Sequence, residues 1–146
     1  HTNDAAGAVT RLQDMGVEGY LISSSLLAIQ AQRLVRRVCT ECAETHPLSL
    51  DEARVLDIDS AECAEIRRGK GCERCGQTGY RGRVGLYELL LMSDEIRHQI
   101  ASGADANSIR DTAIKGGMRT LRQDALEKLR AGLTTPEEVV RVTRAV

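Results

Sequence analysis

The chain has 146 residues and a formal net charge of −1; 42% of the residues are hydrophobic and 28% are charged, and no apolar run approaches the about 18–20 residues that a membrane-spanning helix needs. This mixture is typical of a globular protein, and the near-neutral charge excludes a general attraction to nucleic acid or anionic lipid. Because the chain has no Phe, no Trp and only three Tyr, we expect several small subdomains rather than one large core.

Two helices are predicted before the first cysteine. Thr2, Asn3 or Asp4 can cap the first, which ends at Gly16. The second is predicted over residues 20–38, because apolar residues recur on one helical face: Leu27, Ala31, Leu34 and Val38. No strand is predicted in residues 1–38. We therefore expect the surface that both helices cover to lie upstream, in a larger α/β core of a longer protein.

Four of the five cysteines form two C-x-x-C pairs, Cys39 with Cys42 and Cys72 with Cys75, separated by 29 residues. Each pair places two thiolates on one side of a tight turn, and two such turns close a tetrahedron around zinc. Sulfur then fills all four positions, so the predicted metal is structural rather than catalytic. Because apolar residues between the pairs are few, we expect this arm to lose its fold when the metal is removed.

Two other uses of these cysteines are less favoured. We expect no secretory leader, which disfavours disulfides, and a thioredoxin-like dithiol needs only one C-x-x-C after a strand. The fifth cysteine, Cys63, has no partner at ligand spacing. Its neighbours Glu62 and Glu65 disfavour its thiolate, so we interpret Cys63 as an ordinary thiol.

Charge is divided along the same arm. Residues 42–65 carry seven acids and one arginine, whereas residues 66–83 carry six basic residues and one glutamate. One interpretation is a solvated face. The sharper one is a docking surface for a partner protein or for acidic phospholipid headgroups. Its candidate residues are Arg67, Arg68, Lys70, Arg81 and Arg83.

The rest of the chain is predicted as strands followed by helices. Residues 80–92 show little alternation, as expected for strands that are covered on both faces, and Gly82 and Gly85 mark a turn or bulge. Residues 93–146 predict a bundle of four short helices. The predicted starts of these helices are at Ser93, at Asp105 or Asn107, at Thr120 and at Thr135, the last two as capping boxes.

These motifs together resemble a known family. The motif HTNDA (His1–Ala5), the segment YLISSSLLAIQAQRLVRRVC, the two cysteine pairs and YRGRVGLYELL follow one another as in the C-terminal part of the secretion and pilus-assembly ATPases. The type II secretion ATPases are the most similar group, and pilus-assembly ATPases are the alternative. The resemblance implies the α/β edge of a RecA-like nucleotide-binding core (1–38), a zinc-binding tetracysteine subdomain (39–79), strands returning to the core (80–92) and a C-terminal helical bundle (93–146).

The resemblance also implies an activity for the parent protein. That protein would be a cytoplasmic homo-hexamer at the bacterial inner membrane, where ATP hydrolysis extends a pseudopilus and the zinc arm couples to a platform protein. By the same match His1 would lie near the terminal phosphate of the nucleotide. The sequence contains neither a G-x-x-x-x-G-K-[ST] motif nor Walker B acids, so ATP and magnesium would bind only to the parent, and this part alone should not hydrolyse ATP.

Two functions of other classes remain as alternatives. One is an autonomous zinc-dependent interaction module with no enzyme attached. The other is a nucleic-acid-binding zinc ribbon, which needs a basic face interleaved with aromatic residues. Only Tyr80 and Tyr87 are near the cysteine pairs and the arm before them is acidic, so no nucleic-acid partner is expected.

Overall fold

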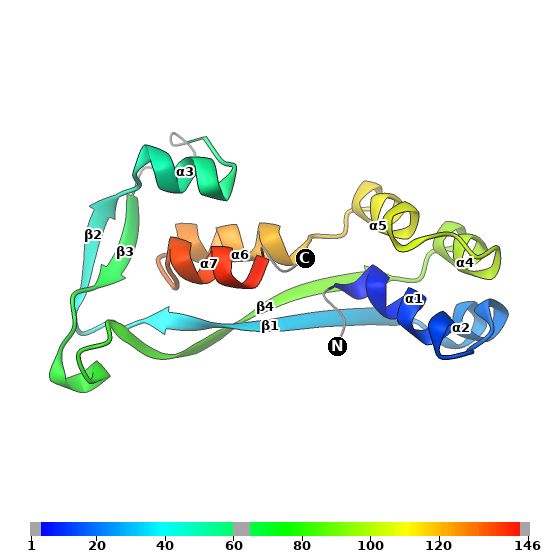
Figure 1. The fold of residues 1–146 in the computed structure, drawn as a ribbon, viewed down its shortest axis with the longest axis horizontal. Helices are drawn as coiled ribbons and strands as arrows, with labels where there is room; N and C mark the ends of the chain where they lie inside the picture. Colours follow the sequence, from blue (N-terminus) through cyan, green and yellow to red (C-terminus); the bar gives the residue numbers. More distant parts are fainter. Residues whose placement is uncertain (1–3, 60–64, 144–146) are drawn as a thin grey trace. The chain divides into compact units, whose positions relative to one another are not determined.

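The computed structural model describes residues 4–59 and 65–143, so the predicted site residue His1 and the fifth cysteine, Cys63, lie outside the described residues. Helices and strands follow one another along the chain, with two C-terminal pairs of helices after the last strand (Figure 1). In chain order they are α1 (Ala5–Asp14), α2 (Gly19–Ser25), β1 (Ala28–Val38), β2 (Ala43–Pro47), α3 (Leu50–Leu56), β3 (Glu65–Gly69), the 3-10 turn η1 (Glu73–Cys75), β4 (Tyr80–Leu91), α4 (Asp94–Ala101), α5 (Ala106–Lys115), α6 (Leu121–Arg130) and α7 (Pro136–Thr143).

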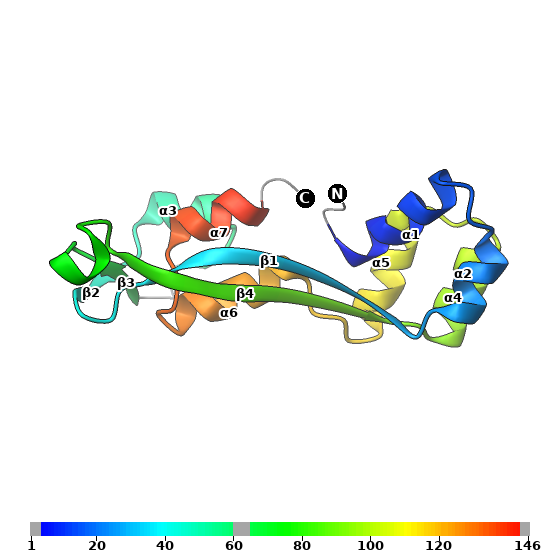
Figure 2. The same cartoon turned by 90° about the horizontal axis from the view of Figure 1, so that it is seen from below.

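The chain forms two compact units. Unit 1 comprises His1–Gln32 and Tyr87–Leu121, and unit 2 comprises Arg33–Leu86 and Arg122–Val146. The strands β1 and β4 are hydrogen-bonded neighbours and run side by side (Figure 2). Each of the two strands therefore contributes residues to both units.

Unit 1 is built on helix contacts. Helix α2 packs on α4, α1 packs on α5, and α4 packs on α5. Their inward side chains share one apolar cluster with the end of β4, which includes Val9, Ile22, Leu90, Ile96, Ile100 and Ile109. The surface that α1 and α2 cover thus comes from later helices of the same chain. The larger α/β core upstream stays a prediction.

The helix predicted over residues 20–38 is also wrong. Helix α2 ends at Ser25, and β1 follows with side chains that alternate between exposed and more buried along residues 28–35. The hydroxyls of Ser23 and Ser24 donate to the carbonyls of Tyr20 and Leu21, a local bond that competes with helix continuation. The alternation of Gln30 and Gln32 with Ile29 and Ala31 is a period-2 signal that the helical reading overlooked.

Strand β4 is a single strand of 12 residues, and one of its faces is uncovered. Leu86, Glu88 and Leu90 are buried, whereas the alternate residues Tyr87, Leu89 and Leu91 are exposed. The predicted cover on both faces is therefore wrong for this part of the strand. The apolar run hid a period-2 pattern, because hydrophobic residues also occupy the outward positions.

Several predicted helix starts are confirmed. The carboxylate of Asp4 accepts from the Gly7 amide at 2.7 Å at the start of α1. Ser93 caps α4, and Asp105 caps α5 by accepting from the amides of residues 107 and 108. Helix α7 begins at Pro136, as proline at the first helical position predicts. These helix starts depend on residues within a few positions of one another, so the sequence alone predicts them.

Unit 2 contains the arm between the cysteine pairs. Strands β2 and β3 pair antiparallel, with Ala43 opposite Gly69 and Pro47 opposite Glu65, and lie side by side in Figure 1. Helix α3 lies between these two strands in the chain and packs on α7. Helices α4 and α5 belong to unit 1, whereas α7 and all of α6 except Leu121 belong to unit 2. The four helices predicted as one bundle are thus divided between the two units.

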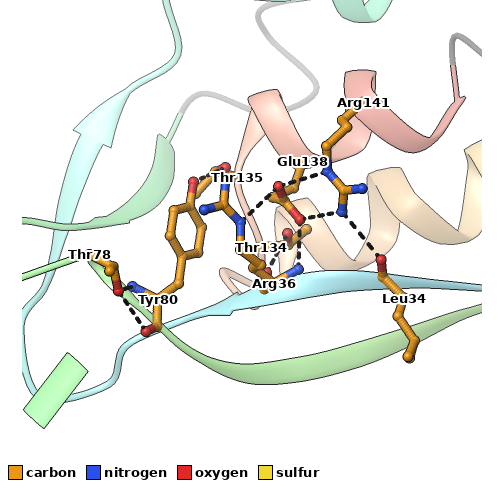
Figure 3. Close-up of polar contacts among 8 residues, drawn as sticks. All are labelled: Leu34, Arg36, Thr78, Tyr80, Thr134, Thr135, Glu138 and Arg141. Atoms are coloured by element: carbon orange, nitrogen blue, oxygen red, sulfur yellow. Dashed lines mark hydrogen bonds and ion pairs between the residues drawn. The ribbon is translucent and has the colours of Figure 1, made fainter. Parts of the chain in front are cut away.

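A buried carboxylate on α7 organises unit 2 (Figure 3). Glu138 is 1% exposed, and it accepts from the Arg36 amide at 2.7 Å and from the guanidinium groups of Arg36 and Arg141. The Arg36 guanidinium also stacks over the Tyr80 ring, whose hydroxyl bonds the hydroxyl of Thr135. Burial alone raises the pKa of Glu138, but these hydrogen bonds from Arg141 and Arg36 outweigh it and lower the pKa to about 2.

We predict that Glu138→Gln lowers the free energy of unfolding by about 1–3 kcal/mol. The substitution removes the negative charge and replaces one acceptor oxygen by an NH₂ group, so some of the donors on Arg36 and Arg141 lose their acceptor. The folded-state pKa lies below the unfolded value of about 4.3, so this stabilisation is present at pH 7 and is lost as the pH falls toward 2. Urea unfolding at several pH values measures it. The difference between the two proteins should shrink between about pH 5 and pH 2; a difference that does not change with pH would contradict the assignment.

Candidate metal centre

The four paired cysteines lie where strands begin and end. Cys39 directly follows β1, and Cys42 directly precedes β2. Cys72 directly precedes the turn η1, and Cys75 is the last residue of that turn, shortly before β4. Backbone bonds join these segments: the Cys39 amide donates to the Gly79 carbonyl at 2.9 Å, and the Lys70 amide donates to the Cys42 carbonyl at 3.1 Å. The sheet ends therefore bring together two cysteine pairs that are far apart in sequence.

The sulfur atoms have the spacing of a tetrahedral site. All four Sγ atoms lie within 4.8 Å of one another. The Sγ–Sγ distance is 3.9 Å for Cys39–Cys72, 3.9 Å for Cys42–Cys75 and 3.7 Å for Cys72–Cys75. A tetrahedron with metal–sulfur bonds of about 2.3 Å has edges of about 3.8 Å, whereas a disulfide bond is about 2.05 Å. The four free thiols therefore fit one metal ion with an all-sulfur shell.

Backbone amides support the cluster from outside. The amides of Cys72 and Gly79 each donate to the Cys75 sulfur at 3.3 Å, the kind of contact that stabilises a metal-bound thiolate. Burial raises the pKa of the Cys75 thiol, but these two donors and the neighbouring thiols lower it to about 6. Burial raises the pKa of Cys42 to about 12, in spite of a backbone hydrogen bond from Gly71. Bound metal would take all four sulfurs as thiolates.

Glycine at two positions allows the backbones around the cluster to meet. A Cβ atom on Gly69 would lie 2.1 Å from the Gly79 carbonyl oxygen, and a Cβ on Gly79 would lie 2.3 Å from that of Gly69. Gly79 also has φ of +76°, a conformation that other residues rarely adopt. The turn after Cys75 therefore requires glycine for both space and backbone conformation.

The opposite charges of the arm meet within it. Lys70 pairs with Glu44 at 2.7 Å, and Arg68 pairs both with Glu52 on α3 and with Glu137 on α7. The β2–β3 pairing accounts for the first contact, because it places Glu44 beside the basic residues of β3, whereas Arg68 reaches its partners on helices outside this strand pair. Of the five predicted docking residues, Arg68 and Lys70 thus have internal partners.

The other three docking candidates are exposed. Arg67 lies on β3, and Arg81 and Arg83 lie near the start of β4. Part of the Arg67 side chain is close to the α6–α7 connection, since a Cβ atom on Gly132 would lie 2.7 Å from the Arg67 Cδ. Lys70 is exposed as well, with 64% of its side chain accessible, so Arg68 is the one candidate of the five that is not exposed.

The segment that follows His1 has its own polar contacts in unit 1. Asp4 is 5% exposed and pairs with Arg110 on α5. Glu88, 3% exposed, accepts from the amide of Ala5 at 2.8 Å and from the amide of Leu121 at 3.1 Å. The sequence analysis missed Arg110, Glu88 and Glu138. For Glu88 a signal was present, since a lone acid between Leu86 and Leu90 on the inward face of an apolar strand needs a partner.

The fold and the cluster together define a small mixed α/β protein with a tetracysteine site suited to a structural metal. Comparison with protein families agrees with this class: the model of the family described as "Type II/IV secretion system protein" matches residues 1–141. The chain belongs to this family. No helix among residues 4–59 and 65–143 has both the length and the apolar character to span a bilayer.

Individual relatives are similar over nearly the whole chain. The "Type IV pilus assembly ATPase PilB" of Thermus thermophilus is 49% identical over 142 residues, covering 96% of this chain and 16% of that protein. The "Type II secretion system ATPase E" of Vibrio cholerae is 44% identical over 144 residues, and the "Type II secretion system protein E" of Pectobacterium carotovorum is 48% identical over 145 residues. Each of these two matches covers 99% of this chain and 28% of the relative.

We predict that Cys39→Ser and Cys72→Ser each abolish stoichiometric metal binding, because a serine hydroxyl is a poor substitute for a thiolate at a soft site. Atomic absorption of freshly purified protein measures the metal content per chain. The matched control is Cys63→Ser, which changes the remaining cysteine and should retain the metal. Full metal content in either of the first two variants would refute their assignment as ligands.

Proposed function

We propose that this chain is the C-terminal part of a cytoplasmic, hexameric ATPase that powers type II protein secretion at the bacterial inner membrane. The observation that carries the proposal is the family match over residues 1–141, together with relatives that are named as secretion and pilus ATPases. The chain spans 16–28% of the length of these relatives. The hydrolysis itself would use Walker motifs, ATP and magnesium supplied by the rest of the parent.

Within this proposal the parts of the chain have different roles. Residues 1–38 and 80–92 would belong to the edge of a RecA-like core, residues 39–79 to a zinc subdomain and residues 93–146 to a helical region. Zinc is the metal that the four sulfurs favour, because it prefers tetrahedral thiolate shells and closed structural sites. It would hold the ends of β1, β2, β3 and β4 together, and the residues that would bind it are Cys39, Cys42, Cys72 and Cys75.

The zinc arm would couple the motor to its membrane platform. The exposed Arg81 and Arg83 lie at the start of β4, a few residues after the last cysteine of the cluster. A partner protein or acidic phospholipid would contact them there on a strand that the metal site holds in place. The internal pairing of Arg68 and Lys70 supports a smaller contact surface centred on β4. A surface of few charges favours contact with a defined partner, such as the inner-membrane platform protein, over a broad electrostatic layer.

A pilus-assembly ATPase is the second candidate function. The Thermus thermophilus relative supports it, because its identity of 49% is similar to the 48% of the Pectobacterium carotovorum secretion protein. Both functions share hydrolysis, the metal arm and a membrane platform. Deleting the parent gene and scoring exported proteins and surface pili separately would distinguish them.

We predict that His1→Ala in the full-length parent lowers kcat for ATP hydrolysis by about tenfold or more and changes KM by less than about twofold. The reason is that a group beside the terminal phosphate would act mainly in the transition state. Steady-state hydrolysis at varied ATP concentration measures both constants. Equal effects on kcat and KM would contradict this role, and an unchanged kcat would remove His1 from the proposal.

We predict that Arg81→Glu with Arg83→Glu abolishes stimulation of the full-length ATPase by acidic phospholipid vesicles or by the platform protein, because both positive charges are reversed. Basal hydrolysis without vesicles should be unchanged. The matched control reverses two exposed cations of unit 1, Arg11 and Lys115, for the same change in net charge. Equal loss of stimulation in the control would show a general charge effect and contradict a defined surface.

A further inference from the structure

The start of helix α7 is held by the strand that leads into the metal site. Strand β1 ends at Val38, immediately before the ligand Cys39. The Val38 amide donates to the Leu133 carbonyl at 2.9 Å, and the Thr134 hydroxyl donates to the Arg36 carbonyl at 2.9 Å. The β1 residues that contact the start of α7 therefore lie within three positions of a metal ligand.

The strand that leaves the metal site contacts the same helix start (Figure 3). Tyr80 is the first residue of β4, and its hydroxyl bonds the hydroxyl of Thr135 at 2.8 Å, directly before Pro136 begins α7. The Thr78 hydroxyl donates to the Cys75 carbonyl at 2.7 Å and accepts from the Tyr80 amide at 3.2 Å. A short series of hydrogen bonds thus runs from a ligand residue to the start of the helix.

Arg36 joins the two sides of this contact. Its guanidinium lies over the Tyr80 ring, with 4.1 Å between the guanidinium carbon and the ring centroid. The same group donates to the carboxylate of Glu138, the third residue of α7, at 3.0 Å. All of these residues belong to unit 2. One side chain of β1 therefore contacts both the first residue of β4 and the first turn of α7.

The start of α7 meets both strands at once, so the end of β1 and the start of β4 must keep a fixed spacing. One backbone hydrogen bond joins them there, from the Cys39 amide to the Gly79 carbonyl at 2.9 Å. The sulfurs of Cys39 and Cys72 lie 3.9 Å apart, where two thiolates repel each other unless a cation binds both. A metal ion bound by the four sulfurs would hold the two strand ends at the spacing that α7 needs.

We propose that metal occupancy controls the docking of α7, and that Arg36 and Tyr80 are the residues that couple the two. Helix α7 has a docked and an undocked state, and metal binding shifts the population toward the docked one. Docking in turn raises the affinity for the metal, because coupling between two binding events is reciprocal. The metal site then acts on a helix outside its own arm. This inference does not depend on ATP hydrolysis, so it can fail while the proposed function stands.

The first test measures the Zn²⁺ affinity of the full chain by competition with a chromophoric chelator. Tyr80→Phe keeps the ring under Arg36 and all four sulfurs, and it removes only the hydroxyl that bonds Thr135. We expect the Zn²⁺ affinity to fall by about three- to tenfold, as the loss of one hydrogen bond predicts. An unchanged affinity would overturn the role of Tyr80.

The matched control is Thr143→Val, which also replaces a hydroxyl of unit 2 by an apolar group. The Thr143 hydroxyl is buried and donates to the Val139 carbonyl within α7. This bond is made inside the helix in both states, so the Zn²⁺ affinity should stay within about 1.5-fold of the wild type. An equal loss of affinity in both variants would show that any weakening of unit 2 lowers metal binding, and it would overturn the proposed coupling.

The second test follows amide hydrogen exchange with and without Zn²⁺. Removing the ion with a chelator should speed exchange at residues 138–142 by about tenfold or more, whereas α4 and α5 of unit 1 should change by less than about twofold. In the Zn²⁺-loaded Tyr80→Phe variant, the first turn of α7 should exchange about threefold faster than in the wild type. Unchanged exchange in α7 after verified loss of the ion would overturn the proposal. Equal increases in α4 and α5 would show global unfolding and would overturn it as well.

Discussion

The four sulfur atoms are the constraint on which the arrangement of unit 2 depends. They lie at the end of β1, at the start of β2, just after β3 and just before β4, so one ion bound there would fix four chain directions at one point. The arm between the cysteine pairs has few large apolar side chains, with Leu56 and Ile66 fully buried. A metal shell that contributes on the order of 10 kcal/mol can replace a core of that size.

Buried carboxylates are the second feature that holds the small cores of this chain together, a role that large aromatic side chains have in many other proteins. Glu138 joins α7 to β1 by accepting from the Arg36 amide and guanidinium, and Glu88 on β4 accepts from the amides of Ala5 and Leu121 within unit 1. Such contacts are directional, unlike apolar packing, and they lose most of their value when one partner moves. A chain without Phe or Trp is held in register in this way while its cores stay small.

The sequence predicts what depends on neighbouring residues and misses what depends on distant ones. The caps at Asp4, Ser93 and Asp105 follow from side-chain chemistry within a few residues. The metal cluster joins distant segments, but each C-x-x-C pair is a local motif and two such pairs predict a shared metal ion. The apolar residues of β1 fit both a helical and a strand period; the alternating Gln30 and Gln32 favour a strand, and pairing with β4 stabilises it. The amides that Glu88 and Glu138 accept from could not be predicted, since they lie 33 to 102 residues away along the chain.

The ion pairs of unit 2 bear on the hypothesis that the arm carries a basic docking surface. A run of acids followed by a run of bases suggests two opposed surfaces, yet the antiparallel pairing of β2 with β3 places Glu44 of the acidic run opposite Arg68 of the basic run. Lys70 meets Glu44, and Arg68 meets Glu52 and Glu137, so much of the polarity is used inside unit 2. The exposed pair Lys70–Glu44 contributes little to stability, about 0–1 kcal/mol. The effect of these ion pairs is instead to leave Arg81 and Arg83, on the rigid strand that leaves the metal cluster, as the cations best placed to meet another molecule.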